Sequence, residues 1–313
     1  MLKRWHIDTR ILLPSVSKKY LKINKDNSII DEWGIIKYRS KESPFFYNIK
    51  SPLQYFKINE NLDKYNWPDP NKCILIDKLK KEAKKLYYNT EKYVIVLNLS
   101  AQILHRAIWL RSFEVFMIDL ILHRSFAEKL LDYILEYELK RIKNILKAVG
   151  DYIQVAFIAD DLGSQNAPLI SPKLYKELFK PRQEKICSLI KYFSGAKILY
   201  HSCGSIQDFM GDLIEIGVDI INPIQVGAKG MEPKILKKRY GNNIVFWGAI
   251  DTQKVLPFGS VQEVKIEVLN RIKELWSNGG YIVSTTQNIQ SDITPKNICT
   301  LFDTLDNINK NLR

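Results

Sequence analysis

Apolar runs and amphipathic stretches alternate along the chain from about residue 90 to its end. The first apolar run is YVIVLNLS at 93–100, and apolar residues then recur at helical spacing from Phe126 to Leu146. Further apolar runs follow, each separated from the next by an amphipathic stretch, at 152–160, 196–203, 218–223, 243–251 and 281–287. This pattern predicts six strands joined by helices.

Residues typical of helix starts occur at the beginning of three of the predicted helices. Ser171 with Pro172, and Thr294 with Pro295, are typical of an N-cap followed by a first helical residue. Ser260 and Glu263 have the spacing of a capping box, in which each residue's side chain bonds the other's backbone N–H. These signals predict helices that begin near residues 172, 261 and 295.

Repeated strand–helix units predict an α/β protein with a parallel sheet, either doubly wound or a (β/α)8 barrel. No glycine-rich phosphate-binding motif follows any predicted strand, and the last units are short and evenly spaced, so we expect the (β/α)8 TIM-type barrel. Residues 1–90 lack clean strand–helix units and predict an irregular cap or edge, with a strand pair within 29–40. Since no linker separates this segment from 91–313, we expect one domain over 1–313.

The bulk composition narrows the function classes. The net charge is +13, but the lysines are spread along the chain and do not interleave with aromatic residues, so we expect no nucleic-acid partner. No apolar run reaches the ~20 residues of a membrane helix, and the first residues do not form a leader sequence. Four scattered cysteines do not suggest a disulfide framework. We therefore expect a cytoplasmic protein without a membrane partner.

Polar residues gather where five successive predicted strands end. In a barrel this edge carries the active site, so these residues are the candidate site. They are Asp160, Asp161 and Gln165; His201 and Cys203; Asn222 and Gln225; Trp247 and Asp251; and Gln287.

His201 and Cys203 are the most informative pair among them. Residues i and i+2 of a strand point to the same face, and imidazole and thiolate together supply half of a tetrahedral zinc site. A buried, purely structural pair and a catalytic Cys–His pair are alternatives. A third ligand would come from Asp160, Asp161, Gln165, Asp251 or Gln287, because Cys187 and Cys299 lie among apolar helical residues and predict core packing.

Several long segments, taken in order, resemble the uroporphyrinogen decarboxylase superfamily. The resemblance covers roughly residues 90–310, and DEWG at 31–34 also fits. The segments are DDLGSQNAPLISPKLYKELFKPRQEKI from 160, HSCGSI from 201, GVDIINPIQVGAKGMEPKILKKRYG from 217, FWGAIDTQKVLP from 246 and NIQSDITPKNI from 288. The resemblance implies a (β/α)8 barrel whose first strand is either lacking or replaced by residues 1–60.

The resemblance also implies a function. One branch of the superfamily decarboxylates uroporphyrinogen, and it carries an arginine-rich segment that this chain lacks. The other branch consists of zinc-dependent methyltransferases that exchange methyl groups between a corrinoid and a thiol or other acceptor, and its H-x-C pair matches His201 and Cys203. Gln287 stands where relatives carry a His or Cys.

The expected function is therefore zinc-dependent methyl transfer with methylcobalamin, or with a corrinoid protein as partner, and a small-molecule methyl donor or acceptor. His201, Cys203 and Asp161 are the predicted catalytic residues, and His201 and Cys203 the predicted metal ligands. The other polar residues at the strand ends are predicted to bind substrate. Tetrapyrrole decarboxylation and a non-catalytic family member are the alternatives.

Overall fold

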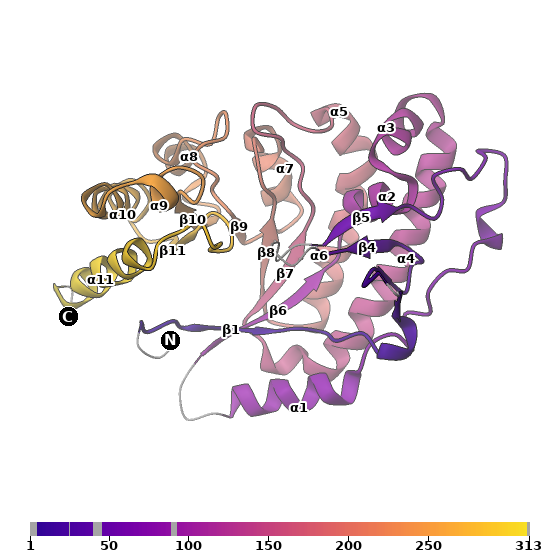
Figure 1. Ribbon diagram of the computed structural model, residues 1–313, viewed down its shortest axis with the longest axis horizontal. Coiled ribbons are helices and arrows are strands. Elements are labelled where there is room, and N and C mark those ends of the chain that lie inside the picture. Colours follow the sequence, from indigo (N-terminus) through magenta and orange to yellow (C-terminus); the bar gives the residue numbers. More distant parts are fainter. Residues whose placement is uncertain (1–4, 25, 40–45, 89–92, 312–313) are drawn as a thin grey trace. The chain divides into compact units, whose positions relative to one another are not determined.

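The computed structural model describes residues 5–24, 26–39, 46–88 and 93–311. The backbone divides into two compact units (Figure 1). The N-terminal unit comprises Arg10–Asp160 and Pro181–Ala196, and the C-terminal unit comprises the first nine residues, Asp161–Lys180 and Lys197–Arg313. A single domain over 1–313 stays a prediction.

In the N-terminal unit three strands form a sheet in the order β1, β6, β7, and helices pack beside it (Figure 1). Strands β6 and β7 are parallel, with Val96 opposite Val155. Four of the five residues of β7 are buried, as expected of a parallel strand covered on both faces. The bounds are β1 (Thr9–Leu12), α1 (Ile76–Tyr87), β6 (Val94–Ser100), α2 (Leu104–Arg111), α3 (Phe113–Leu122), α4 (Arg124–Val149), β7 (Val155–Ala159) and α6 (Lys180–Phe193).

Helix α4 carries the apolar positions that the sequence places between Phe126 and Leu146. Its buried side chains recur at three- and four-residue intervals, and α1, α2 and α3 pack against it. The helical prediction for this stretch is confirmed.

A second, antiparallel sheet in the same unit has the order β2, β3, β4, β5, with bounds β2 (Lys22–Ile23), β3 (Ile29–Ile30), β4 (Ile36–Tyr38) and β5 (Tyr47–Lys50). Strands β3 and β4 confirm the strand pair predicted within 29–40 as far as residue 39; Ser40 lies outside the described residues. Short 3-10 turns, η1 (Lys18–Tyr20) and η2 (Leu62–Lys64), stand among these connections.

The C-terminal unit has a four-stranded parallel sheet in chain order, β8 to β11, and helices that pack on one another (Figure 1). Helices α8 and α11 both contact α10. Ile250 of β10, Val264 and Val268 of α10 and Leu301 of α11 belong to one buried core cluster. The bounds are α5 (Pro172–Leu174), the π-helical segment η4 (Tyr175–Phe179), β8 (Lys197–His201), η5 (Gln207–Phe209), α7 (Met210–Glu215), β9 (Ile220–Asn222), α8 (Pro233–Tyr240), β10 (Val245–Ile250), α9 (Val255–Phe258), α10 (Val261–Leu275), β11 (Tyr281–Thr285) and α11 (Pro295–Asn311).

The predicted helix starts are confirmed in this unit. The Ser260 hydroxyl accepts a hydrogen bond from the Glu263 N–H at 3.3 Å, and the Ser260 N–H donates to Glu263 Oε2 at 2.7 Å, which completes the capping box. The Ser171 hydroxyl accepts from the Leu174 N–H at 3.2 Å. Local capping hydrogen bonds are therefore present at these two helix starts.

The protein is a mixed α/β fold, and the six predicted strands are all present. The predicted closed (β/α)8 barrel is not present among the described residues. Strands β1 and β6–β11 are seven strands of the barrel type, whereas a closed (β/α)8 barrel needs eight. Strand β1 arises within the irregular segment 1–90. Among the described helices, none is both long enough and apolar enough to cross a membrane.

Candidate metal centre

His201 and Cys203 stand at the end of β8 and lie close together. The distance from His201 Nε2 to Cys203 Sγ is 3.6 Å, as the i, i+2 spacing predicts. Strand β8 ends at His201, so Cys203 lies just beyond the strand in the turn that leads to Gly204. The central residues of β8 are buried, which holds the strand firmly beneath both side chains.

Asp161 joins this pair. Its Oδ1 lies 3.8 Å from His201 Nε2 and accepts a hydrogen bond from the Cys203 N–H at 2.7 Å. One ligand atom from each of the three residues falls within 4.8 Å of the others, and all three side chains are partly exposed. Sequence reasoning left the third position open among several residues, and the structure brings Asp161 to it.

Asn222 fixes the protonation of the His201 ring. In the parallel register His201 pairs with Asn222 on β9, and His201 Nδ1 lies 2.6 Å from Asn222 Oδ1. The Asn222 Nδ2 group donates to the Trp247 carbonyl at 3.1 Å, so its Oδ1 must be the acceptor. Nδ1 of His201 then carries the proton, and Nε2 presents its lone pair to Cys203 and Asp161. This is the usual arrangement of a metal-binding histidine.

Burial and the Asp161 carboxylate raise the pKa of Cys203 to about 12. A catalytic Cys–His pair needs the opposite shift, because its thiol is activated by a lowered pKa. At neutral pH the thiol is therefore protonated, and a bound cation would displace that proton.

Gly163 and Gly204 let the loop after Asp161 and the loop after Cys203 approach each other closely. Gly204 has φ +84°, and a Cβ there would overlap the Gly163 carbonyl and lie 2.6 Å from the Ser164 carbonyl oxygen. The Ser205 N–H donates to that Ser164 oxygen at 2.8 Å. The backbone after Asp161 is thereby joined to the backbone after Cys203.

Replacing Gly204 with alanine is expected to destabilise the protein by about 1–3 kcal/mol, because a left-handed residue and a backbone overlap are both unfavourable. Urea unfolding measures this change. Gly211→Ala on α7 is the matched control, since Gly211 has free space around it, and we expect it to leave stability equal or slightly raised. Equal stability of the two variants would contradict the expectation.

Amide side chains support the same turn from the other side. The Gly204 N–H donates to Gln225 Oε1 at 2.7 Å, Gln225 Nε2 donates to Gln165 Oε1 at 2.9 Å, and Gln165 Nε2 donates to the Gly227 carbonyl at 2.6 Å. Gln287 reaches the cluster as well, with its Nε2 3.9 Å from Cys203 Sγ. The structure thus brings Gln287 into contact with Cys203 and Gln225 into contact with Gly204, while Gln165 supports Gln225 from behind. Sequence reasoning missed Gln253, whose Oε1 lies 3.4 Å from Gln225 Nε2.

Two predicted site residues have structural partners instead. Asp160 is fully buried and lies in the N-terminal unit, where its carboxylate accepts the N–H groups of Ile103, Leu104 and His105 at the start of α2. Asp251 accepts the N–H groups of Gln253 and Lys254 at the turn after β10. Substrate binding by these two residues stays a prediction that these contacts do not favour.

One comparison with known proteins shows the family of the chain. The family model for uroporphyrinogen decarboxylase (URO-D) matches residues 99–308, about two thirds of the chain. No curated protein is significantly similar to the chain in sequence.

Among solved structures, the methyltransferase from Methanosarcina mazei superposes with a TM-score of 0.73 at 17% identity, over 98% of this chain and 82% of that one. A D-tagatose 3-epimerase-like protein gives a TM-score of only 0.36 at 13% identity, over 76% of this chain and 85% of that one. The first of these similarities shows a shared fold.

Proposed function

The chain belongs to the uroporphyrinogen decarboxylase family. We propose that it is a zinc-dependent methyltransferase of this family. Its reaction would exchange a methyl group between a corrinoid carrier and a thiol or other acceptor. The observation that carries the proposal is the cluster of Asp161, His201 and Cys203, with the His201 ring oriented by Asn222. The fold shared with a methyltransferase supports the same branch of the family.

The donor set suits zinc better than a harder cation. Thiolate, imidazole and a carboxylate are the ligands that Zn²⁺ takes, whereas Mg²⁺ and Ca²⁺ prefer oxygen alone. Three protein ligands also leave one tetrahedral position for a substrate. We therefore propose that His201 Nε2, Cys203 Sγ and an Asp161 oxygen hold the ion.

Bound zinc would lower the pKa of a substrate thiol and keep it as the thiolate nucleophile. The residues of the chain do the rest. Asn222 keeps the proton on His201 Nδ1, so that the lone pair of Nε2 is available to the ion. Gln225 and Gln165 hold the Gly204 turn, and Gln287 lies beside Cys203, where its amide is available to a polar group of the substrate.

The methyl group would come from a corrinoid. The corrinoid would supply the methyl group without its bonding electrons, so that the substrate thiolate would become a thioether and the corrinoid would be left reduced by two electrons. We propose a corrinoid protein as the natural partner.

The proposal is tested with the full-length protein, zinc, methylcobalamin and a small thiol such as 2-mercaptoethanol. The expected result is loss of the methylcobalamin absorption spectrum together with the formation of the methyl thioether, measured by mass spectrometry. Cys203→Ser should abolish both, and Cys299→Ser on α11 should leave both unchanged. Corrinoid binding without turnover would contradict the proposal in favour of a non-catalytic member, and carbon dioxide release from uroporphyrinogen would favour the decarboxylase branch.

Gln287→His offers a gain-of-function prediction. Gln287 Nε2 already lies 3.9 Å from Cys203 Sγ, so an imidazole at this position adds a nitrogen ligand at the edge of the cluster. We expect zinc to bind at least about tenfold more tightly, measured by competition with a chromophoric chelator. Gln287→Leu serves as the control and should not tighten binding. Equal affinities in the two variants would contradict the prediction.

A further inference from the structure

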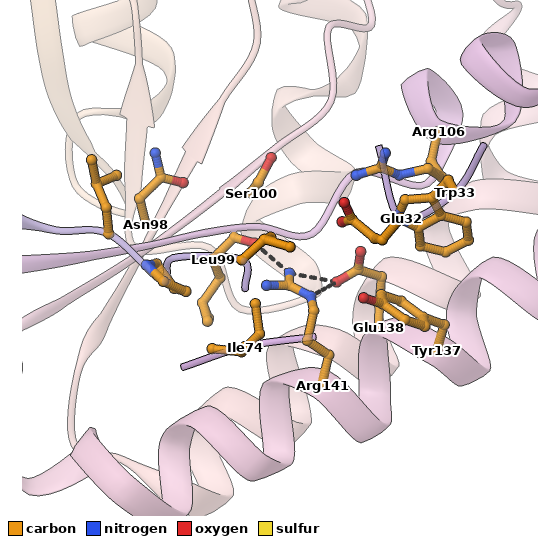
Figure 2. A pocket seen from close by; sticks show the side chains of 13 residues that line it. Glu32, Trp33, Ile74, Asn98, Leu99, Ser100, Arg106, Tyr137, Glu138 and Arg141 are labelled. Carbon is orange, nitrogen blue, oxygen red and sulfur yellow. Dashed lines mark hydrogen bonds and ion pairs between the residues drawn. The ribbon is translucent and has the colours of Figure 1, made fainter. Parts of the chain in front are cut away.

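The N-terminal unit contains a cavity of about 220 Å³ that the proposed methyl transfer does not use (Figure 2). None of the residues that line it belongs to the metal cluster. Its walls come from the loop that carries DEWG (31–34), the end of β6, the start of α2, the middle of α4 and the segment after β1. At about 30 Å³ for each water, this space equals about seven water molecules, which is room for a small organic molecule.

The DEWG loop is built to present Glu32 and Trp33. Asp31 Oδ1 accepts the N–H groups of Trp33 and Ile35, each at 3.0 Å, and Gly34 takes φ +74° to close the turn. The Asp31 side chain is therefore occupied within the loop and by Lys37, at 2.6 Å. The residues on either side of the turn become the wall of the cavity.

Two of the acidic side chains that line the cavity, Glu138 and Glu32, differ in whether they have an ion-pair partner. Arg141 donates to Glu138 through Nε at 2.9 Å and Nη2 at 2.6 Å, and both side chains are buried. Glu32, by contrast, makes no hydrogen bond or ion pair with any described residue. Its charge still acts on its surroundings, because burial and the Glu32 carboxylate together raise the pKa of Cys73.

Arg106 is held in place but is not saturated. Its guanidinium lies 4.7 Å from the centroid of the Trp33 ring and 5.5 Å from that of Trp109. Its nearest carboxylate oxygen among the described residues is Asp31 Oδ2, at 4.0 Å. The two rings help to hold the guanidinium, and its Nε has no hydrogen-bond partner.

Several residues that line the same space carry buried polar atoms without hydrogen-bond partners. These atoms include Arg106 Nε and Trp33 Nε1, which are donors, and Asn98 Oδ1, which is an acceptor. Trp33 is 1% exposed, so water outside the cavity does not satisfy its N–H group. Each such atom costs about 1–3 kcal/mol when it is left unpaired. In Figure 2, Glu32, Trp33 and Arg106 lie together at one end of the drawn group and Asn98 at the other.

The backbone at the edge of the cavity is strained. Ser100 and Ala101 have φ of +61° and +49°, and the register of β6 against β7 shifts between Asn98 and Ser100. The Leu99 carbonyl thereby reaches the Arg141 guanidinium. Bulges and left-handed non-glycine residues concentrate where a strand end serves a ligand.

We propose that this cavity binds a small zwitterion of the amino-acid class. The ligand carboxylate would accept from Arg106 Nε and Trp33 Nε1, and the ligand ammonium group would donate to Glu32, which lies at the same end of the cavity (Figure 2). A plain anion would leave the Glu32 charge uncompensated, and a plain cation would leave the guanidinium without a partner. A zwitterion satisfies both, and the small cavity restricts it to a short side chain.

The indole N–H of Trp33 provides a direct readout. The chain has six tryptophans, so a ¹⁵N spectrum of the full-length protein contains at most six indole signals, and Trp33→Phe identifies the one from Trp33. The protein is titrated separately with L-alanine, with propionate, which lacks the ammonium group, and with ethylamine, which lacks the carboxylate. We expect L-alanine to shift the Trp33 signal saturably and to bind at least tenfold more tightly than either of the other two.

Glu32→Gln tests the role of the carboxylate. This variant keeps the shape of the side chain and breaks no hydrogen bond of the protein, so it should fold normally. We expect at least a tenfold loss of L-alanine affinity, because a charge-assisted bond becomes a neutral one, and Glu114→Gln on the exposed face of α3 should cause none.

A Trp33 signal that no probe moves would mean that water alone fills the cavity and would overturn the proposal. Equal affinity for propionate, or unchanged affinity in Glu32→Gln, would do the same. Zinc content and methyl transfer do not enter these measurements, so the result is independent of the proposed function.

Discussion

Replacing Cys203 with serine is expected to weaken zinc binding by at least about 100-fold. Loss of a residue that only orients a ligand already costs about 10–100-fold in metal affinity, and Cys203 would be a ligand itself. Serine is nearly isosteric but does not supply a thiolate at neutral pH. Metal content after purification and competition with a chromophoric chelator both measure the change.

Cys299→Ser is the matched control for this substitution. It makes the same chemical change on α11 in the same unit, at another partly exposed cysteine that is not in the metal cluster. We expect its zinc content to equal that of the unchanged protein. If Cys203→Ser kept its zinc, or if both variants lost it equally, the cluster would not be the metal site.

Replacing Arg111 with methionine is expected to lower the free energy of unfolding by about 3–5 kcal/mol. Arg111 is 4% exposed and Asp119 is 1% exposed, and Arg111 Nε lies 2.6 Å from Asp119 Oδ2. The same guanidinium also donates to the carbonyl groups of Leu53 and Phe56. Methionine fills most of the volume but leaves Asp119 Oδ2 and these carbonyl groups without their donor, while His123 Nδ1 still lies 2.8 Å from Asp119 Oδ1.

Lys140→Met on α4 provides the contrast. Lys140 pairs with Glu136 at 2.5 Å, but both side chains are more than half exposed. We expect a change below about 1 kcal/mol, because exposed ion pairs contribute little. Urea unfolding of the two variants side by side measures the difference. Similar values would show that burial does not control the contribution of the Arg111 pair.

The sequence by itself determined the elements of the repeating region. The six apolar runs and the capping residues Ser171 and Ser260 depend on interactions within a few residues, so pattern and spacing predict them correctly. The close approach of His201 and Cys203 belongs to the same class, because two positions along one strand fix it.

Only the tertiary structure decided the third member of the cluster and the roles of the other polar residues. Asp160 and Asp161 are adjacent and chemically identical, yet Asp160 holds the start of α2 and Asp161 contacts Cys203. Side chains that follow each other along the backbone point in different directions, and which partners they meet depends on loops and strands far away in the sequence.

The residues that line the cavity beside DEWG could be predicted even less from the sequence. Glu32, Asn98, Arg106 and Arg141 are spread over more than a hundred residues, and no spacing rule connects them. Apart from the strand pair within 29–40, the irregular N-terminal segment has no periodic pattern from which its other strands or its neighbours in space could be predicted. Its place along the cavity is set by backbone hydrogen bonds such as Leu75 N–H to the Ser15 carbonyl, at 3.0 Å, which depend only on how the chain folds back. Short-range physics thus determined the elements, and long-range packing determined the sites.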